Sequence, residues 1–135
     1  MRRSILAASM LGALAACGYT PGPEVKETRD TMKEIATGVN AYKKDLGHWP
    51  PTTKLSALIE KPAAGSPDAK KWKGPYLKDK EVPKDAWGKD FIFNVPGRNG
   101  LSFDLISYGE DGKWGGKKDA QDIAFDSKSL PPPPR

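Results

Sequence analysis

Residues 24–47 read EVKETRDTMKEIATGVNAYKKDLG, and this stretch predicts a long amphipathic helix. Its apolar residues recur at roughly helical spacing and share one face, whereas charged residues occupy the other face. The apolar residues are Val25, Met32, Ile35, Ala36, Val39 and Tyr42. Lys43-Lys44 in the last turn complement the helix dipole. Gly47 and then Pro50-Pro51 end the helix, because glycine is favoured just past a helix end and proline cannot continue one.

The chain that follows changes to short and irregular patterns. Thr52 or Thr53 can cap a short second helix, which carries Leu55, Leu58 and Ile59 and ends before Pro62. Residues 61–90 are rich in Pro, Gly and Lys, with aromatic residues between them. They predict a long irregular segment that the aromatic side chains hold in place.

Strand patterns appear late in the chain. Residues 91–95 and 101–107 are largely apolar runs on either side of Asn99-Gly100, a pair that favours positive φ in a hairpin connection. Residues 123–125 predict a third strand. A long helix followed by a small antiparallel sheet predicts an α+β fold, with one domain expected for 135 residues.

The segment before the helix has the layout of a bacterial lipoprotein signal. Arg2 and Arg3 form a positive n-region, and residues 5–16 form an apolar stretch that is shorter than the ~20 residues needed to cross a bilayer. The run Leu14-Ala15-Ala16-Cys17 resembles a lipobox, and Cys17 is the only cysteine. We therefore expect a diacylglycerol on its thiol and cleavage before it, because several acyl chains together anchor a protein stably to a membrane.

Two other interpretations of this segment stay open. The protein could be an ordinary secreted one that is cut near Ala16, although a free exposed thiol is a liability in an oxidising compartment. The Arg2-Arg3 pair could also belong to a twin-arginine export signal, but two arginines are the minimum that any n-region offers. By resemblance to the sorting rule of Gram-negative lipoproteins, Gly18 behind the cysteine, where inner-membrane lipoproteins carry Asp, favours the outer membrane.

Composition and residue context exclude several functional classes. The formal net charge is +5 and basic residues alternate with acidic ones, so we expect no nucleic-acid partner. The single cysteine allows no internal disulfide. His48, the only histidine, is expected on the surface or packed in a loop, and no serine has a nucleophile-elbow context. We therefore expect neither an enzyme nor a small-molecule substrate.

Two expectations concern packing. Strand alternation places Asp104 on the solvent side of residues 101–107. The large apolar side chains of the tryptophans are expected in the core. These are Trp49, Trp72, Trp87 and Trp114.

Four blocks of the sequence resemble the major pseudopilin of type II secretion systems. They are Tyr42-Lys43-x-Asp45-x-Gly47-x-Trp49-Pro50; Trp72-Lys73-Gly74-Pro75-Tyr76-Leu77 with Pro83-Lys84-Asp85-x-Trp87-Gly88; Phe103-Asp104-Leu105-Ile106-Ser107-Tyr108-Gly109-x-Asp111-Gly112; and Gly115-Gly116 with an acid-containing stretch that ends at Asp122-Ile123. The blocks follow the family's order and cover about residues 24–127. The resemblance implies a pilin-like α+β fold and a structural role in secretion.

The N-terminal segment departs from that family. A pseudopilin begins with a prepilin leader, cut before a long apolar helix that holds the subunit in the inner membrane and packs in the filament core. Here a lipoprotein signal is expected in that place, and the helix from about Glu24 carries charge on most turns. We therefore expect a lipid-anchored protein that differs from a standard filament subunit.

The resemblance also implies a calcium site in the loop after the central strands. The family's main-chain ligand corresponds to the carbonyl of Tyr108, and its acids correspond to Asp111 and Asp122. Asp119 is expected to substitute for a missing carboxylate and Gln121 to offer its amide oxygen. Ca²⁺ takes about six to eight oxygen ligands, which carboxylates and carbonyls of such a loop can supply.

Residue chemistry alone leaves a different interpretation of this loop open. An acidic, glycine-rich loop is more often a solvated turn than a metal site. Lys113, Lys117 and Lys118 also add positive charge, so any calcium is expected to bind more weakly than is usual in the family.

These patterns divide the chain into a signal peptide at residues 1–16, a lipidated cysteine with a Gly/Pro tether at 17–23, a pseudopilin-like domain at 24–127 and a Pro-rich disordered tail at 128–135. We expect a lipid-anchored structural or assembly component of the bacterial envelope, associated with type II secretion. Its partners would be the membrane and other secretion components. The alternative is an envelope lipoprotein that uses the same head as a binding module for adhesion or display.

Overall fold

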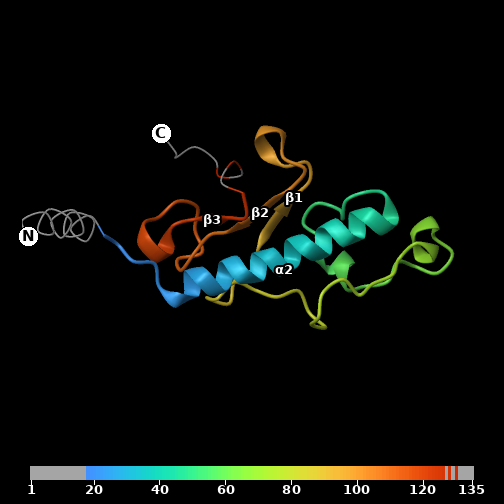
Figure 1. Cartoon of the computed structure of the whole chain (residues 1–135), viewed down its shortest axis with the longest axis horizontal. Coiled ribbons are helices and arrows are strands. Elements are labelled where there is room, and N and C mark those ends of the chain that lie inside the picture. The colour runs from blue at the N-terminus through green and yellow to red at the C-terminus, as the bar shows by residue number, and fades with distance from the viewer. Residues whose placement is uncertain (1–17, 127, 129, 131–135) are drawn as a thin grey trace, which may run out of the picture.

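The computed structural model describes residues 18–126, 128 and 130. Helix α2, Pro23–Leu46, runs along the length of the molecule, and a three-stranded sheet packs beside it (Figure 1). The strands are β1 at Ile92–Asn94, β2 at Asp104–Ser107 and β3 at Ile123–Ala124. The expected α+β class, a long helix on a small antiparallel sheet, is confirmed.

Helix α2 begins and ends close to the expected positions. Pro23 suits its first turn, because the fixed φ of proline is helical and its missing N–H would have no helical partner there. Gly47 ends the helix with φ 84°, and its N–H donates to the carbonyl of Lys43 at 2.9 Å. Within residues 18–126, 128 and 130, no helix is both long enough and apolar enough to cross a membrane.

The three strands form an antiparallel sheet with β2 in the centre. Phe93 of β1 lies opposite Leu105 of β2, and Ser107 of β2 lies opposite Ile123 of β3. Asn99 and Gly100, in the connection between β1 and β2, adopt φ 52° and 81°. The three predicted strands and the positive φ of the Asn-Gly pair are therefore confirmed, but β2 begins at Asp104 rather than at Leu101.

The second helix differs from the expectation. It is a single 3-10 turn at Leu55–Leu58, and no side chain caps it. The Thr52 hydroxyl instead donates to the carbonyl of Val95 at 2.8 Å and accepts the N–H of Val95 at 2.9 Å. The N–H of Thr53 donates to the carbonyl of Phe93 at 2.9 Å. Thr52 and Thr53 therefore pair with the chain at β1 and satisfy hydrogen-bonding groups at this edge of the sheet. These long-range hydrogen bonds take the place of a local helix cap.

Residues 61–90 are irregular as expected, apart from a 3-10 turn at Pro67–Lys70. This segment crosses α2 closely at Gly38, where an added Cβ would lie 2.9 Å from the carbonyl oxygen of Tyr76. The Tyr76 hydroxyl also donates to the carboxylate of Asp45 on the helix at 2.9 Å. A glycine inside the helix therefore makes room for the irregular segment, which aromatic and polar contacts hold in place.

The core lies between the apolar face of α2 and the sheet. Its buried side chains are Val25, Met32, Ile35, Val39, Tyr42, Leu46, Leu55, Leu58, Leu77, Phe91, Phe93, Leu105 and Ile123. Burial of each large aliphatic or aromatic side chain contributes about 1.5–3 kcal/mol, so this cluster is the main source of stability. Trp49, Trp72 and Trp87 pack against it half-buried, whereas Trp114 is half-buried in the loop between β2 and β3.

Asp104 corrects a sequence-based expectation, because it is buried rather than on the solvent side. Only 1% of the residue is exposed. Its carboxylate accepts the N–H of Arg98 at 3.0 Å and lies 3.7 Å from the Arg98 Nε. Strand alternation assumes that one face of the sheet is open to water, but the loop between β1 and β2 folds back over this end of the central strand.

Several expectations fall on residues outside the described part of the chain. These are the signal peptide at residues 1–16, the lipidation site Cys17 and residues 131–135 of the tail. The described part of the tether, from residue 18, leads directly into α2.

Candidate functional site

The candidate site is the loop of residues 108–122, which connects β2 to β3. It lies at the end of the molecule where α2 begins, next to the chain that leads to residue 18 (Figure 1). Gly109 opens the loop with φ 71°, and an added Cβ there would lie 2.8 Å from the carbonyl oxygens of Asp119 and Gln121. The two ends of the loop therefore touch, and main-chain oxygens gather at its base.

Of the predicted ligands, Asp111 lies near enough to Asp122 for its negative charge to act on the carboxyl of Asp122. Both carboxylate oxygens of Asp122 accept the N–H of Gly115, each at 3.0 Å. Partial desolvation raises the pKa of Asp122, the Gly115 N–H opposes this shift, and the negative charge of Asp111 adds to it. A desolvated carboxylate beside a second carboxylate is a pair that a bound cation would stabilise.

Asp119 is directed to a different neighbour. It lies in the 3-10 turn Lys118–Ala120, and its carboxylate accepts hydrogen bonds from the Tyr19 hydroxyl and from the N–H of Gly22. The distance from the Gly22 nitrogen to the carboxylate oxygen is 3.2 Å. Asp119 therefore fastens the loop to the tether that precedes α2.

The remaining predicted ligands, Tyr108 and Gln121, stand at the two ends of the loop. Tyr108 follows the last residue of β2, and Gln121 is exposed just before β3. Within the described ranges, no three His, Cys, Asp or Glu side chains converge as a metal site. A cation in this loop would rely on Asp111 and Asp122 for charge and on carbonyl or amide oxygens for the rest, a donor set that fits Ca²⁺.

A buried acid that the sequence analysis did not single out supports the start of this loop. Asp85 is 4% exposed, and its carboxylate accepts the hydroxyl of Ser107 at 2.7 Å and the N–H of Lys89 at 2.8 Å. The Ser107 hydroxyl in turn accepts the N–H of Gly109 at 3.1 Å. The irregular segment thus positions the first residues of the loop. Asp85 stands in one of the blocks that resemble the pseudopilin family, and this resemblance was the feature of the sequence that could have identified it.

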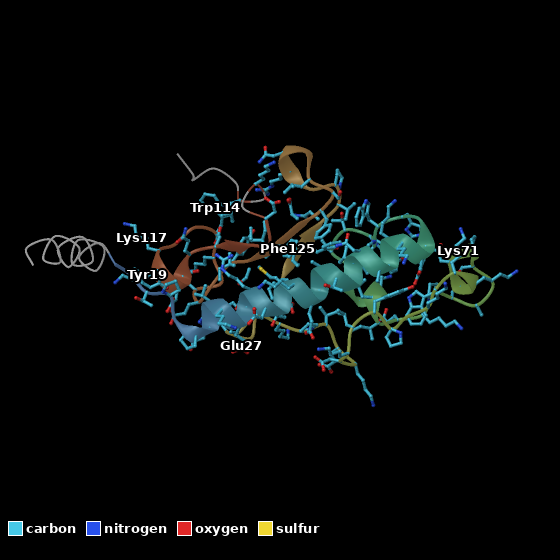
Figure 2. All side chains as sticks on the ribbon, in the orientation of Figure 1. Tyr19, Glu27, Lys71, Trp114, Lys117 and Phe125 are labelled. Carbon is cyan, nitrogen blue, oxygen red and sulfur yellow. The ribbon has the colours of Figure 1, made fainter. Side chains whose placement is uncertain are left out.

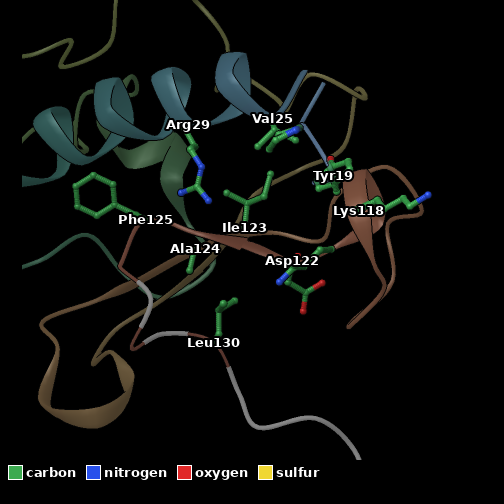
Figure 3. Close-up of a pocket in the computed structure, with 11 residues that line it drawn as sticks. Tyr19, Val25, Arg29, Lys118, Asp122, Ile123, Ala124, Phe125 and Leu130 are labelled. Carbon is green, nitrogen blue, oxygen red and sulfur yellow. The ribbon is translucent and has the colours of Figure 1, made fainter. Parts of the chain in front are cut away.

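A pocket of about 390 Å³ adjoins the loop, between the first turns of α2 and β3 (Figure 3). Val25, Arg29 and Ile123 line its inner side, and Tyr19 and Lys118 stand next to each other at its edge. The pocket, the loop and the tether therefore occupy the same end of the molecule.

His48 lies near the other end of α2 and packs in a loop contact, as expected. Its ring nitrogens lie 3.0 Å from the carbonyl oxygen of Trp49 and 3.0 Å from the carboxylate of Asp68. The carbonyl of Trp49 and then Asp68 raise the pKa of His48, because both accept hydrogen bonds from the protonated ring. This pair links the end of the helix to the irregular segment.

Comparison with known proteins identifies relatives over most of the chain. A family model described as "Type II secretion system (T2SS), protein G" matches residues 17–126. A type II secretion system core protein G from Pseudomonas aeruginosa is 40% identical over 102 residues, which cover 74% of this chain and 69% of the relative. The protein of that name from Xanthomonas campestris pv. campestris is 35% identical over 97 residues, with coverages of 72% and 62%. The one from Vibrio cholerae is 33% identical over 106 residues, with coverages of 73% and 69%.

A solved structure shows the same fold. The major pseudopilin from the type 2 secretion system of enterohaemorrhagic Escherichia coli aligns with a TM-score of 0.57 and 24% identity. The alignment covers 75% of this chain and 84% of that one. The expected pilin-like arrangement of helix and sheet is therefore confirmed.

Proposed function

The chain belongs to the type II secretion system protein G family, and from this membership we propose that it is a structural component of the secretion apparatus. From its N-terminal sequence and from the loop of residues 108–122, we further propose that it is lipid-anchored and holds one calcium ion in that loop. The family is one of secretion-associated, envelope-associated structural proteins rather than of enzymes. The match of the family model over residues 17–126 is the observation that carries this proposal.

The anchor is proposed from the N-terminal sequence. Cys17 ends a lipobox-like run, and the short tether from residue 18 joins it to α2. Acyl chains on Cys17 would hold the domain at a membrane surface, where a secretion component has to act, and Gly18 favours the outer membrane. Metabolic labelling with a fatty acid tests this directly. Wild type should carry the label and Cys17→Ser should not. An unlabelled wild type would instead support an ordinary secreted protein.

The calcium ion is proposed from the chemistry of the loop. Asp111 and Asp122 would supply the negative charge, and the main-chain oxygen of Tyr108 and the amide oxygen of Gln121 are further donors at the loop's two ends. Asp119 is the weakest candidate in the predicted set, because its carboxylate bonds outside the loop, to Tyr19 and Gly22, whereas Asp111 and Asp122 bond to N–H groups within the loop. When bound, the ion would neutralise the paired acids and tie the two ends of the loop together.

Thermal unfolding with and without calcium tests the ion. For a dissociation constant tenfold below the calcium concentration, binding to the native state adds about 1.4 kcal/mol, which raises Tm by about 5 °C in a domain of this size. Asp111→Asn and Asp122→Asn should each abolish the rise, whereas Asp90→Asn, an exposed acid outside the loop, should keep it. An unchanged wild-type Tm at millimolar calcium would exclude the site.

The secretion role is tested in the source bacterium. Deletion of the gene should reduce export of type II substrates, and wild type should restore it better than Cys17→Ser does. Co-purification of another secretion component with the lipidated protein is also expected. Normal export in the deletion strain, with no secretion component co-purifying, would instead favour the envelope binding module for adhesion or display.

A further inference from the structure

The end of the molecule next to the proposed anchor carries a basic surface, here called the basic end surface, formed by Lys117, Lys118 and Tyr19, with Lys113 in the same loop (Figure 2 and Figure 3). All four residues are exposed. Lys117 and Tyr19 lie together at the end of the molecule where the chain runs toward Cys17 (Figure 2). Across the described residues, none of the three lysines forms an ion pair, so their charges face solvent.

Three of the four acidic side chains of the same loop accept hydrogen bonds from the chain, although Asp111 and the fourth acid, Glu110, are exposed. Asp119 accepts a hydrogen bond from the N–H of Gly22 in the tether. Asp122 accepts the N–H of Gly115, and Asp111 accepts the N–H of Lys113 at 3.0 Å. These carboxylates therefore have partners within the chain, whereas the ammonium groups of Lys113, Lys117 and Lys118 are exposed and form no ion pair among the described residues. Calcium between Asp111 and Asp122 would remove further negative charge from this end of the molecule.

The Asp119 contact fixes the distance between this surface and the anchor. Tyr19 is two residues from Cys17, so at about 3.3–3.6 Å per residue the two Cα atoms are at most about 7 Å apart. The headgroup layer of one leaflet is also about 5–8 Å thick. With acyl chains on Cys17, Tyr19 would lie at headgroup level. Lys118, adjacent in sequence to Asp119, and Lys117, which lies beside Tyr19 in Figure 2, would lie there with it.

We propose that the basic end surface docks on anionic phospholipid headgroups beside the acylated Cys17 and so holds the domain in one orientation on the membrane. Each lysine near an anionic surface contributes about 1 kcal/mol, and tyrosine is favoured at the membrane interface. The tether alone would leave the domain free to rotate. This proposal rests on the lipid anchor of the proposed function, and its test separates the two.

The experiment uses the full chain, extracted from bacterial membranes and reconstituted on vesicles of phosphatidylcholine alone or of a two-to-one mixture with phosphatidylglycerol. Flotation of the vesicles reports the anchor. Acetylation of each lysine, measured by mass spectrometry, reports docking. Labelling of the three loop lysines should fall about threefold or more on the anionic vesicles. Labelling of Lys71, which lies at the opposite end of α2 (Figure 2), and of its neighbour in sequence Lys70 should stay unchanged.

A matched pair of charge reversals provides the control. In Lys117→Glu/Lys118→Glu, the protection of Lys113 should be lost, whereas Lys70→Glu/Lys71→Glu, which carries the same change of charge, should retain it. Flotation on neutral vesicles with equal lysine labelling on both compositions would overturn the docking and leave the anchor intact. Flotation on anionic vesicles only would overturn the anchor and support the docking, and flotation on neither would overturn both.

Discussion

The buried carboxylate of Asp85 should be among the most sensitive polar positions in the protein. The carboxylate accepts the Ser107 hydroxyl at 2.7 Å and the N–H groups of Lys89 at 2.8 Å and of Trp87 at 3.1 Å. It is 4% exposed, so water cannot replace it when it is removed. Asp85→Ala would leave these donors without their acceptor and would free the hydroxyl that positions Gly109.

The expected cost follows from these contacts. A hydrogen bond to a charged group contributes about 1.5–3 kcal/mol, and a buried donor left unsatisfied costs about 1–3 kcal/mol. Because the bonds share one carboxylate they are not additive, and we expect Asp85→Ala to lower the free energy of unfolding by about 3–5 kcal/mol. At about 4 °C per kcal/mol for a domain of this size, Tm should fall by about 12–20 °C.

Urea and thermal unfolding of residues 18–135 measure this effect. Asp85→Asn keeps the shape and one acceptor oxygen, so it should cost about 1–2 kcal/mol. The matched control is Asp90→Ala, since Asp90 pairs only with Lys84 on the exposed surface at 2.7 Å and should change stability by about 0.5 kcal/mol or less. If Asp85→Ala cost no more than Asp90→Ala, the buried network would not support the loop, and the reasoning would be refuted.

Three further predictions test other contacts. Gly38→Val should cost about 1–3 kcal/mol in urea unfolding, because its Cβ would meet the Tyr76 carbonyl oxygen at 2.9 Å; exposed Thr37→Val should cost about 0.5 kcal/mol or less. The pKa of His48 is raised in the folded protein, so the stability that its protonated ring contributes should be present below the unfolded pKa of 6.5 and be lost as the pH rises through the higher folded pKa. A pH series of Tm should show this loss in wild type and not in His48→Gln. Asp119→Ala should speed chymotryptic cleavage after Tyr19 by about fivefold, because its hydrogen bonds hold the tether closed; equal cleavage rates would count against that contact.

Local sequence patterns were sufficient to predict the elements whose conformation depends on residues close together in the chain. The helix follows from apolar spacing and from Gly47, whose φ of 84° suits glycine best. The connection between β1 and β2 follows from Asn99-Gly100, which adopt the positive φ angles that this pair tolerates. These expectations depend on residues within one or two turns of one another, so a single sequence carries them.

Contacts between distant residues could not be predicted in the same way. Thr52 and Val95 are 43 residues apart, and Asp85 and Ser107 are 22 apart, yet each pair shares a hydrogen bond. The burial of Asp104 depends on the loop that folds over β2 and not on strand alternation. Within the candidate site, the same reason explains why Asp119 bonds to the tether while Asp111 acts electrostatically on Asp122.

The sequence by itself determined the family, the α+β class and the long helix, because each is encoded in local composition, periodicity or an ordered set of motifs. Only the tertiary structure decided which acid of the loop holds the tether. Tyr19 and Asp119 are separated by 100 residues in the chain, and they meet because α2 and the sheet pack through a common core. Packing of apolar faces brings such distant groups together, and no local pattern records that outcome.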